Sequence, residues 1–237
     1  TTAKAASTFA SGSVRIARGP YLSNVSPNAA VVSWWTNIPT AGVVSVAGQS
    51  LTDTAGSVQH HAVSVSGLSA GTTYPYTVTS GGASASGSLR TAASPGETFS
   101  FAAIGDFGGQ STGESQNASN IDSSGTQFIQ TLGDNIYPAA GLPDPDFTTT
   151  YSDFGNGEFW SAFPMPGSNH SWYSYTWGDA HILVLDGEQP FATGTDQYNF
   201  AQSDLAAHQG DAWRIVVLQR PPYSSATSSS SSRPVQQ

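Results

Sequence analysis

The sequence has no cysteine, a single methionine and few charged residues. Without cysteine there is no disulfide framework and no thiolate chemistry, and the redox compartment is left open. Only 10% of the 237 residues are charged, against about a quarter in an average soluble domain. The balance is acidic, with a net charge of −9 and a pI near 4.6. Because phosphate backbones select basic surfaces, we expect no nucleic-acid partner.

Long apolar runs are also missing, and none reaches the roughly 20 residues that a helix needs to span a bilayer. We therefore predict no membrane span. Thr1 begins the chain without a basic and then apolar signal pattern, so either a leader has been removed or none existed. Low charge and abundant Ser and Thr favour a secreted or cell-envelope location. Three Asn-x-Ser/Thr sequons matter only in a cell that glycosylates them: Asn24, Asn117 and Asn169.

Residues 1–15 are small and polar without periodicity, which predicts a flexible N-terminal arm. Residues 16–93 carry short β-branched and aromatic runs, separated by turn residues at the spacing of a β-sandwich. Within them, the stretch from Gly67 to Val78 resembles the corner and penultimate strand of a fibronectin type III domain, in which Tyr74 would anchor the corner to the backbone. Pro75 departs from that pattern and would be tolerated at a sheet edge. We expect residues 16–93 to form a fibronectin III-like scaffold.

Histidines and tryptophans in strands raise the question of a binding role. His60 and His61 are adjacent in a predicted strand, so their side chains point to opposite faces and cannot share one site. We expect a surface role for both. Exposed tryptophans stack on sugars, which leaves a carbohydrate-binding role open, although core packing is the commoner fate of a tryptophan in a strand. The tryptophans concerned are Trp34, Trp35, Trp172 and Trp177.

Residues 94–237 have the texture of an α/β domain, after a linker at 92–97 rich in Ala, Ser, Pro and Gly. Apolar runs predict four strands, at 99–105, 128–133, 181–186 and 213–218. A helix is predicted over 196–209, where apolar residues recur on one face. The connection at 111–127 is rich in Asn, Asp, Ser and Gly, which prefer caps and turns, so we expect it to be short or irregular.

The first two of these predicted strands each end in Gly-Asp, at Asp106 and Asp134, and Tyr137 follows the second. A buried parallel strand stopped in this way directs its carboxylate to the edge where open α/β sheets bind ligands. Two adjacent carboxylates repel each other unless a cation or a shared proton neutralises them, so the pair favours a metal site. Each Gly-Asp alone is also an ordinary tight turn.

Four blocks of this half occur in an ordered set: Gly105-Asp106-Phe107-Gly108, Gly133-Asp134-Asn135-Ile136-Tyr137, Asn169-His170 and Leu218-Gln219-Arg220-Pro221-Pro222-Tyr223-Ser224. Their order and spacing resemble the motifs of the purple acid phosphatases within the calcineurin-like metallophosphoesterases. Those enzymes also carry an N-terminal β-sandwich, so the resemblance covers nearly the whole chain from about Arg18. It implies a multidomain β plus α/β fold, in which a fibronectin III-like sandwich precedes a metallophosphoesterase-like α/β sandwich.

The resemblance also implies a role for each matching residue. Asp106 would bind the first metal, Asp134 would bridge both metals, and Tyr137 would bind the first as a phenolate. Asn169 would bind the second metal through its amide oxygen, and His170 would steady the phosphoryl transition state. The implied cofactor is a dinuclear centre of Fe with Fe, Zn or Mn. The implied reaction is the hydrolysis of a small phosphorylated substrate, a phosphate monoester.

Three of the seven metal ligands of that family are substituted or absent, which makes the enzymatic activity uncertain. Gln219 stands where the family has a histidine, and the closing Gly-His-x-His block has no counterpart before Gln237. The family's Gly-Asn-His-Asp/Glu appears here with an inserted serine and without the acid. Imidazole supplies much of the affinity for such ions, so we expect a weak or empty centre. The sequence leaves three explanations open for the missing ligands: the chain is the front part of a longer enzyme, it is a degenerate relative, or the sequence is imperfect. The serine run at 228–232 resembles a linker or a stretch of uncertain residues.

The sequence therefore predicts an extracellular metal-dependent phosphomonoesterase of purple acid phosphatase type, incomplete or inactive in the chain as given. The alternative is a non-catalytic extracellular structural or binding module on the same scaffold, which would self-assemble by strand addition at the sandwich edges or through the N-terminal arm. A fold of this family packs two sheets face to face, so the resemblance implies that the apolar face of the first sheet needs a cover. A missing C-terminal half or another chain would provide it.

Overall fold

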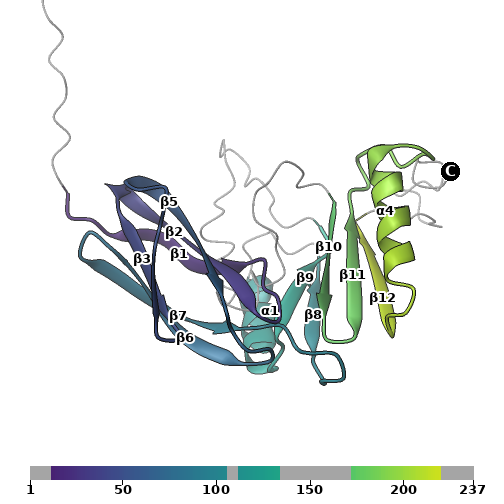
Figure 1. The fold of residues 1–237 in the computed structure, drawn as a ribbon, viewed down its shortest axis with the longest axis horizontal. Coiled ribbons are helices and arrows are strands. Elements are labelled where there is room, and N and C mark those ends of the chain that lie inside the picture. Colours follow the sequence, from purple (N-terminus) through teal and green to yellow (C-terminus); the bar gives the residue numbers. More distant parts are fainter. Residues whose placement is uncertain (1–11, 106–111, 134–171, 220–237) are drawn as a thin grey trace, which may run out of the picture.

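The computed structural model describes residues 12–105, 112–133 and 172–219. This part of the chain is mostly β (Figure 1). The N-terminal strands form a sandwich, and the C-terminal strands form two small sheets with one helix each. No helix in the described ranges is long and apolar enough to cross a membrane.

The N-terminal sandwich consists of two antiparallel sheets with three and four strands. The first has the order β1-β2-β5 and the second the order β4-β3-β6-β7. This division of seven strands is the immunoglobulin-like arrangement of fibronectin III domains, as the sequence predicted. The strands are β1 (Ile16–Ser23), β2 (Ala29–Thr40), β3 (Gly42–Val46), β4 (Gln49–Thr52), β5 (Val58–Ser66), β6 (Thr73–Ser80) and β7 (Ala83–Arg90).

Period-two alternation builds the sandwich core. In β2, Trp34 is fully buried and its Nε1 donates to Ser80 Oγ at 2.9 Å, whereas Trp35 on the other face is 37% exposed. The predicted corner is present, because the Ser69 amide donates to the Tyr74 hydroxyl at 3.0 Å. Pro75 lies in an inner strand rather than an edge strand, but the register of β6 with β3 ends at Tyr76. Pro75 therefore interrupts no pairing with β3. The predicted edge strand is not observed, but Pro75 itself lies beyond the paired part of β3.

The two adjacent histidines of β5 point to opposite faces, as predicted, but a surface role is wrong for one of them. His61 is completely buried, stacks on Trp34 with ring centroids 4.6 Å apart, and its Nδ1 is hydrogen-bonded to Asp53 Oδ2 at 2.8 Å. The inward face of β5 is the core face, and a partner carboxylate makes burial of the imidazole tolerable. His60 stacks on Trp35 on the outer face.

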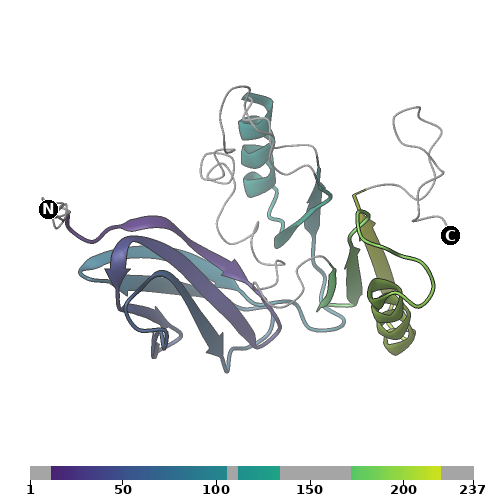
Figure 2. The ribbon, with the colours of Figure 1, turned by 90° about the horizontal axis from the view of Figure 1, so that it is seen from above.

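The C-terminal part contains two strand–helix–strand units. In the first, β8 (Phe101–Ile104) and β9 (Phe128–Thr131) are parallel and α1 (Thr112–Ser123) connects them. In the second, β11 (Ala180–Leu185) and β12 (Trp213–Leu218) are parallel with α4 (Asp196–Ala207) between them, and β10 (Tyr173–Trp177) pairs antiparallel with β11. The two helices lie on opposite sides of these strands (Figure 2).

Helix α1 contradicts the prediction of a short or irregular connection over 111–127. A parallel strand pair needs a long crossover, and a helix satisfies the backbone groups of that crossover. Burial of Ala118 on one face adds packing that outweighs the weak propensity of the Asn and Ser residues. Gly125 ends the helical stretch with a φ of +73°, a conformation that glycine adopts without steric cost.

Aromatic side chains join the two small sheets to each other and to the sandwich. Phe128 packs against Trp177 with ring centroids 4.6 Å apart, and the Tyr175 hydroxyl donates to Gln130 Oε1 at 2.6 Å. Both Trp34 and Trp177 are fully buried in one hydrophobic cluster that also contains Ala92 and Ala93 of the linker. Core packing is therefore the role of these two tryptophans, and they are not available to a sugar.

Candidate functional site at the strand ends

Three motif-bearing strands end next to one another. The parallel register pairs Ile104 with Thr131, and the amide of Leu132 donates to the Ile104 carbonyl at 2.8 Å. A Cβ built on Gly105 would lie 3.1 Å from Leu132 Cβ. The ends of β8 and β9 are thus in direct contact, and the next residues along the chain after Gly105 and Gly133 are the two predicted metal-binding carboxylates.

The end of β12 reaches the same place. A Cβ built on Gly133 would overlap Gln219 Cγ and would lie 2.8 Å from its Cδ and 2.9 Å from its Cβ. Gly133 has a φ of +107°, a conformation that side-chain-bearing residues rarely adopt. Glycine is required here for both reasons, because it supplies the backbone conformation and leaves room for Gln219.

Of the predicted site residues, Gln219 is the one that lies among the described residues, and its side chain is exposed. The others lie outside them: Asp106, Asp134, Tyr137, Asn169 and His170. Their roles therefore stay predictions. The structure brings together Gly105, Gly133 and Gln219, which flank or belong to three of the four motif blocks. Gln219 offers an amide oxygen, a neutral and weaker ligand than the imidazole expected at this position.

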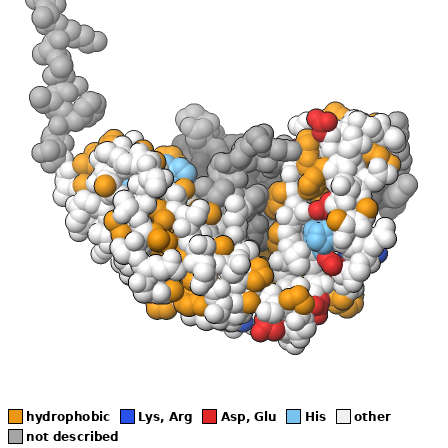
Figure 3. Space-filling model, viewed as in Figure 1, with side chains coloured by type: hydrophobic (Ala, Val, Ile, Leu, Met, Phe, Trp, Pro, Cys, Tyr) orange, Lys and Arg blue, Asp and Glu red, His pale blue; other side chains and the backbone are white. Residues whose placement is uncertain are grey.

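A second polar cluster lies at the other end of the β10-β11-β12 sheet. Among the described residues, one group has enough ligating side chains in reach of one another to hold a metal ion, and it consists of His181, Asp204 and His208. His181 Nε2 is 2.6 Å from Asp204 Oδ2, and the rings of His181 and His208 stack with centroids 3.5 Å apart. Figure 3 shows histidine and acidic side chains next to each other on the part formed by β11 and α4.

These three residues belong to none of the four motif blocks of the sequence. One signal was available, because Asp204 and His208 are four residues apart in a predicted helix and therefore share a face. That His181 would meet them depends on how α4 packs on β11, which no local pattern in the sequence specifies.

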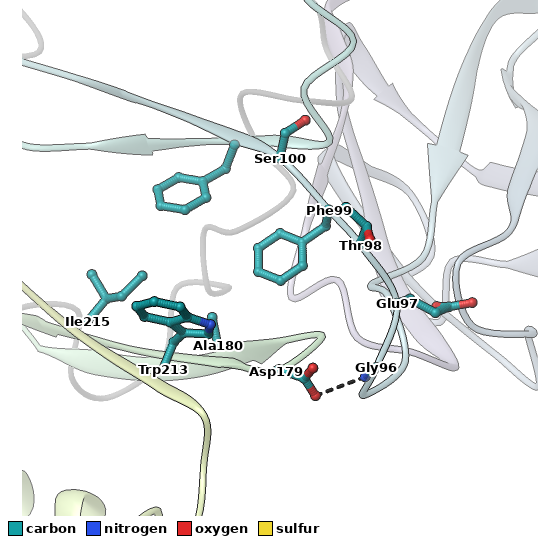
Figure 4. A pocket seen from close by; sticks show the side chains of 10 residues that line it. Gly96, Glu97, Thr98, Phe99, Ser100, Asp179, Ala180, Trp213 and Ile215 are labelled. Carbon is teal, nitrogen blue, oxygen red and sulfur yellow. Dashed lines mark hydrogen bonds between the residues drawn. The ribbon is translucent and has the colours of Figure 1, made fainter.

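A groove beside the linker lies at neither polar cluster. It has a volume of about 570 Å³, and its apolar wall is formed by Phe99, Phe101, Ala180, Trp213 and Ile215 (Figure 4). Its carboxylates have backbone partners, since Asp179 Oδ1 accepts from the Gly96 amide at 2.9 Å and Glu97 Oε2 accepts from the Ser94 amide at 2.6 Å. These contacts fasten the linker at Gly96 and Ser94.

No family model matches the chain, and no curated protein matches it. Among solved structures, the chain is similar to the purple acid phosphatase PPD1 from yellow lupin (Lupinus luteus) seeds, with a TM-score of 0.64 and 17% identity over 88% of this chain and 52% of that one. It is also similar to PhoD, with a TM-score of 0.59 and 12% identity over 88% of this chain and 63% of that one. The chain therefore spans about half the length of the first and less than two thirds of the second.

At these identities the similarity concerns the fold alone. It extends over most of the chain and supports the coarse prediction of a purple acid phosphatase-like architecture. Separately from the fold, the side chains of His181, Asp204 and His208 are the described group that could hold a metal ion. Neither similarity identifies a catalytic residue of this chain.

Proposed function

We propose that this protein has the scaffold and the metal site of a phosphoesterase of purple acid phosphatase type, for small phosphate monoesters outside the cell or in the cell envelope. Residues 1–237 alone are expected to turn over little or no substrate, because Gln219 stands where an imidazole ligand is expected. One observation carries the proposal: the ends of β8, β9 and β12 meet at Gly105, Gly133 and Gln219. The two Gly-Asp motifs therefore start from neighbouring points. The similarity in fold to a plant purple acid phosphatase supports the same conclusion.

The donor set at this edge suits hard metal ions. Asp106, Asp134 and Tyr137 would hold the first ion, and Asp134, Asn169 and Gln219 would hold the second. All of these offer oxygen, which favours a trivalent iron at the phenolate and a divalent partner beside it. When bound, a metal pair supplies Lewis acidity and a water of lowered pKa. The residues of this chain would position the phosphate against that pair, with His170 as a donor to the phosphoryl oxygens.

The proposed position of the second metal ion has the ligands of lower affinity. Gln219 is a neutral amide, and its side chain lies directly against Gly133, the residue before the proposed bridging carboxylate. Such a position still allows an amide oxygen ligand, but it lacks the affinity that an imidazole would bring. This substitution favours the second candidate function, a non-catalytic binding or structural module on a phosphatase scaffold. Metal content separates the two.

Iron uptake followed by visible spectroscopy tests the proposal. A phenolate bound to ferric iron absorbs visible light by charge transfer, so the chain loaded with iron is expected to be coloured, and Tyr137→Phe is expected to lose the colour. Asp134→Asn is expected to lose the iron as well. Asp196→Asn, an exposed carboxylate in the first turn of α4, is the matched control and is expected to behave as the unaltered chain.

Inorganic phosphate is the product of the proposed reaction and is expected to shift the absorption of the iron-loaded protein. A chain that takes up no iron, or an Asp134→Asn variant with unchanged iron content, would reject the strand-end site and leave the non-catalytic module. Colour that survives in Tyr137→Phe would reject the phenolate ligand alone.

A further inference from the structure

We propose that His181, Asp204 and His208 form a site for a single divalent transition ion of the zinc kind, separate from the strand-end site. His181 is the second residue of β11, and Asp204 and His208 lie at the C-terminal end of α4. The strand-end site adjoins the other end of the same sheet. Six residues of β11 at about 3.3 Å each separate the two ends by roughly 15–20 Å.

Each of the three side chains is already held through one polar atom by an outer hydrogen bond, and its second polar atom remains as a potential ligand. Thr176 Oγ1 is 3.1 Å from His181 Nδ1, Ser174 Oγ donates to Asp204 Oδ1 at 2.6 Å, and Asp211 Oδ2 is 2.8 Å from His208 Nδ1. The remaining atoms are the Nε2 atoms of the two histidines and Oδ2 of Asp204. Metal-binding histidines typically have their second ring nitrogen fixed in this way, which sets the tautomer and orients the ring.

Burial and charge favour a cation at this place. His181 is buried, Asp204 is nearly so, and the His208 side chain is 32% exposed, which leaves an open side for entry and for a bound water. Two carboxylates, Asp204 and Asp211, contribute negative charge. Two imidazoles and one carboxylate with an open position are a typical ligand set for zinc, whereas magnesium and calcium prefer oxygen alone.

Metal binding requires a defined local rearrangement. Ligand atoms around a tetrahedral zinc are about 3.3–3.5 Å apart, so the 2.6 Å contact between His181 and Asp204 must open and its proton must leave. The two rings are nearly parallel, with an interplanar angle of 7°, and they must unstack to aim at one point. His208 is the residue able to move, because it caps the end of α4 and is partly exposed.

The expected role of the ion is to fasten α4 to the sheet. The buried apolar contacts between them are few and centre on Leu183, Leu185 and Ala201. An ion bound by β11 and by the last turn of α4 would link the two elements through ligands 23 and 27 residues apart in the chain. Because binding favours the folded state, zinc is expected to raise the melting temperature.

One cation opposes binding and provides a second test. Arg214 on β12 is in register with His181 on β11, and it forms no ion pair with a described carboxylate. Residues in register on parallel strands point to the same face. The guanidinium therefore repels an incoming cation, and Arg214→Gln is expected to tighten zinc binding.

The experiment is a calorimetric titration of the full chain with zinc alone, in an Asp134→Asn background that removes the strand-end site. We expect one equivalent of zinc to bind, His208→Ala to weaken binding more than tenfold, and Thr176→Val to weaken it about 10–100-fold by releasing His181. His60→Ala, a histidine outside the cluster, is the matched control and should change nothing. Far-ultraviolet circular dichroism of the metal-free variants checks that they fold.

The proposal is overturned if the Asp134→Asn protein binds no zinc, or if its zinc affinity is the same in His208→Ala. It is also overturned if magnesium raises the melting temperature as much as zinc does. These outcomes leave the proposed phosphoesterase untouched, because that function depends on iron uptake that Asp134→Asn abolishes. Conversely, zinc binding in the Asp134→Asn background supports the His181 site whatever the fate of the strand-end site.

Discussion

Gly133→Ala is the substitution that tests the meeting of the strand ends most directly. An alanine at a φ of +107° costs about 1–3 kcal/mol in backbone strain. Its Cβ would also overlap Gln219 Cγ and lie 2.9 Å from Gln219 Cβ, which cannot move without the backbone of β12. Overpacking of this kind costs about 1–3 kcal/mol. We expect a total loss of about 2–6 kcal/mol in the free energy of unfolding.

Gly125→Ala separates the two contributions. Gly125 has a φ of +73°, and nothing lies within 4 Å of a Cβ built on it, so its substitution adds strain without overlap. We expect it to cost about 1–2 kcal/mol. Adding Gln219→Ala to Gly133→Ala removes Cγ and Cδ of Gln219, the atoms that the new Cβ would overlap. The double variant should therefore lose about 1–2 kcal/mol less in the free energy of unfolding than the sum of the two single variants.

Urea unfolding of the unaltered chain, the three single variants (Gly133→Ala, Gly125→Ala and Gln219→Ala) and the double variant, with unchanged m values, measures these quantities. If Gly133→Ala costs no more than Gly125→Ala, and the coupling to Gln219→Ala is below about 0.5 kcal/mol, β9 and β12 do not end side by side. The proposed function would then lose the observation on which it depends.

Three further predictions concern the sandwich, alkaline pH and the activity of the chain. Asp53→Asn is expected to cost about 2–4 kcal/mol in urea unfolding, because it leaves the buried His61 without its carboxylate, and an equal cost for the exposed Asp196→Asn would contradict this. Burial raises the pKa of Tyr173 to about 12. The contribution of its neutral hydroxyl to the free energy of unfolding is therefore complete below pH 10 and is lost as the pH rises through 12. The free energy of unfolding measured over that window should decline, and Tyr173→Phe should reduce the decline. Residues 1–237 are expected to hydrolyse an aryl phosphate slowly or not at all with added iron, zinc or manganese, and Gln219→His is not expected to rescue them; robust turnover would reveal ligands that the motifs do not identify.

Local signals in the sequence were enough to predict most strands and one helix. The run from Trp213 to Leu218 forms β12 with the predicted bounds, and α4 begins at the predicted residue because Thr195 caps it, with its hydroxyl accepting from the Tyr198 amide. Strand β8 is shorter than predicted. Phe99 packs against Gly178 and stacks with Phe101 and Phe128 instead of continuing the strand.

The errors arose where tertiary contacts decided the outcome. The residues of α1 favour caps and turns, yet the parallel pairing of β8 and β9 selected a helix. The sequence pattern predicted a surface role for His61, but Asp53, eight positions earlier, bonds to its ring and allows it to be buried. In both places a contact with a neighbouring strand or loop decided the outcome, and the local residue pattern did not.

The candidate sites also combine parts that the local sequence predicts with parts that depend on contacts between distant segments. Gly-Asp after an apolar run is a local pattern, so the edge at Gly105 and Gly133 was predictable from the sequence alone. The contact between Gly133 and Gln219 joins positions 86 residues apart, and it was predictable only through the family resemblance. The cluster of His181, Asp204 and His208 belongs to no such pattern and required the packing of α4 on β11.

The two polar clusters are connected by helix α4. At its first turn, the buried Gln197 accepts from the Asp186 amide at 2.7 Å and donates to the Asp186 carbonyl at 3.0 Å, which fixes the helix to the end of β11. At its last turns, Asp204 is bonded to His181 at the start of β11. Helix α4 leads directly into β12, and the register of β12 with β11 sets where Gln219 emerges. The side chain that completes the strand-end site is therefore positioned by a helix held at both ends through polar bonds, and an ion at His181, Asp204 and His208 would strengthen one of those two attachments.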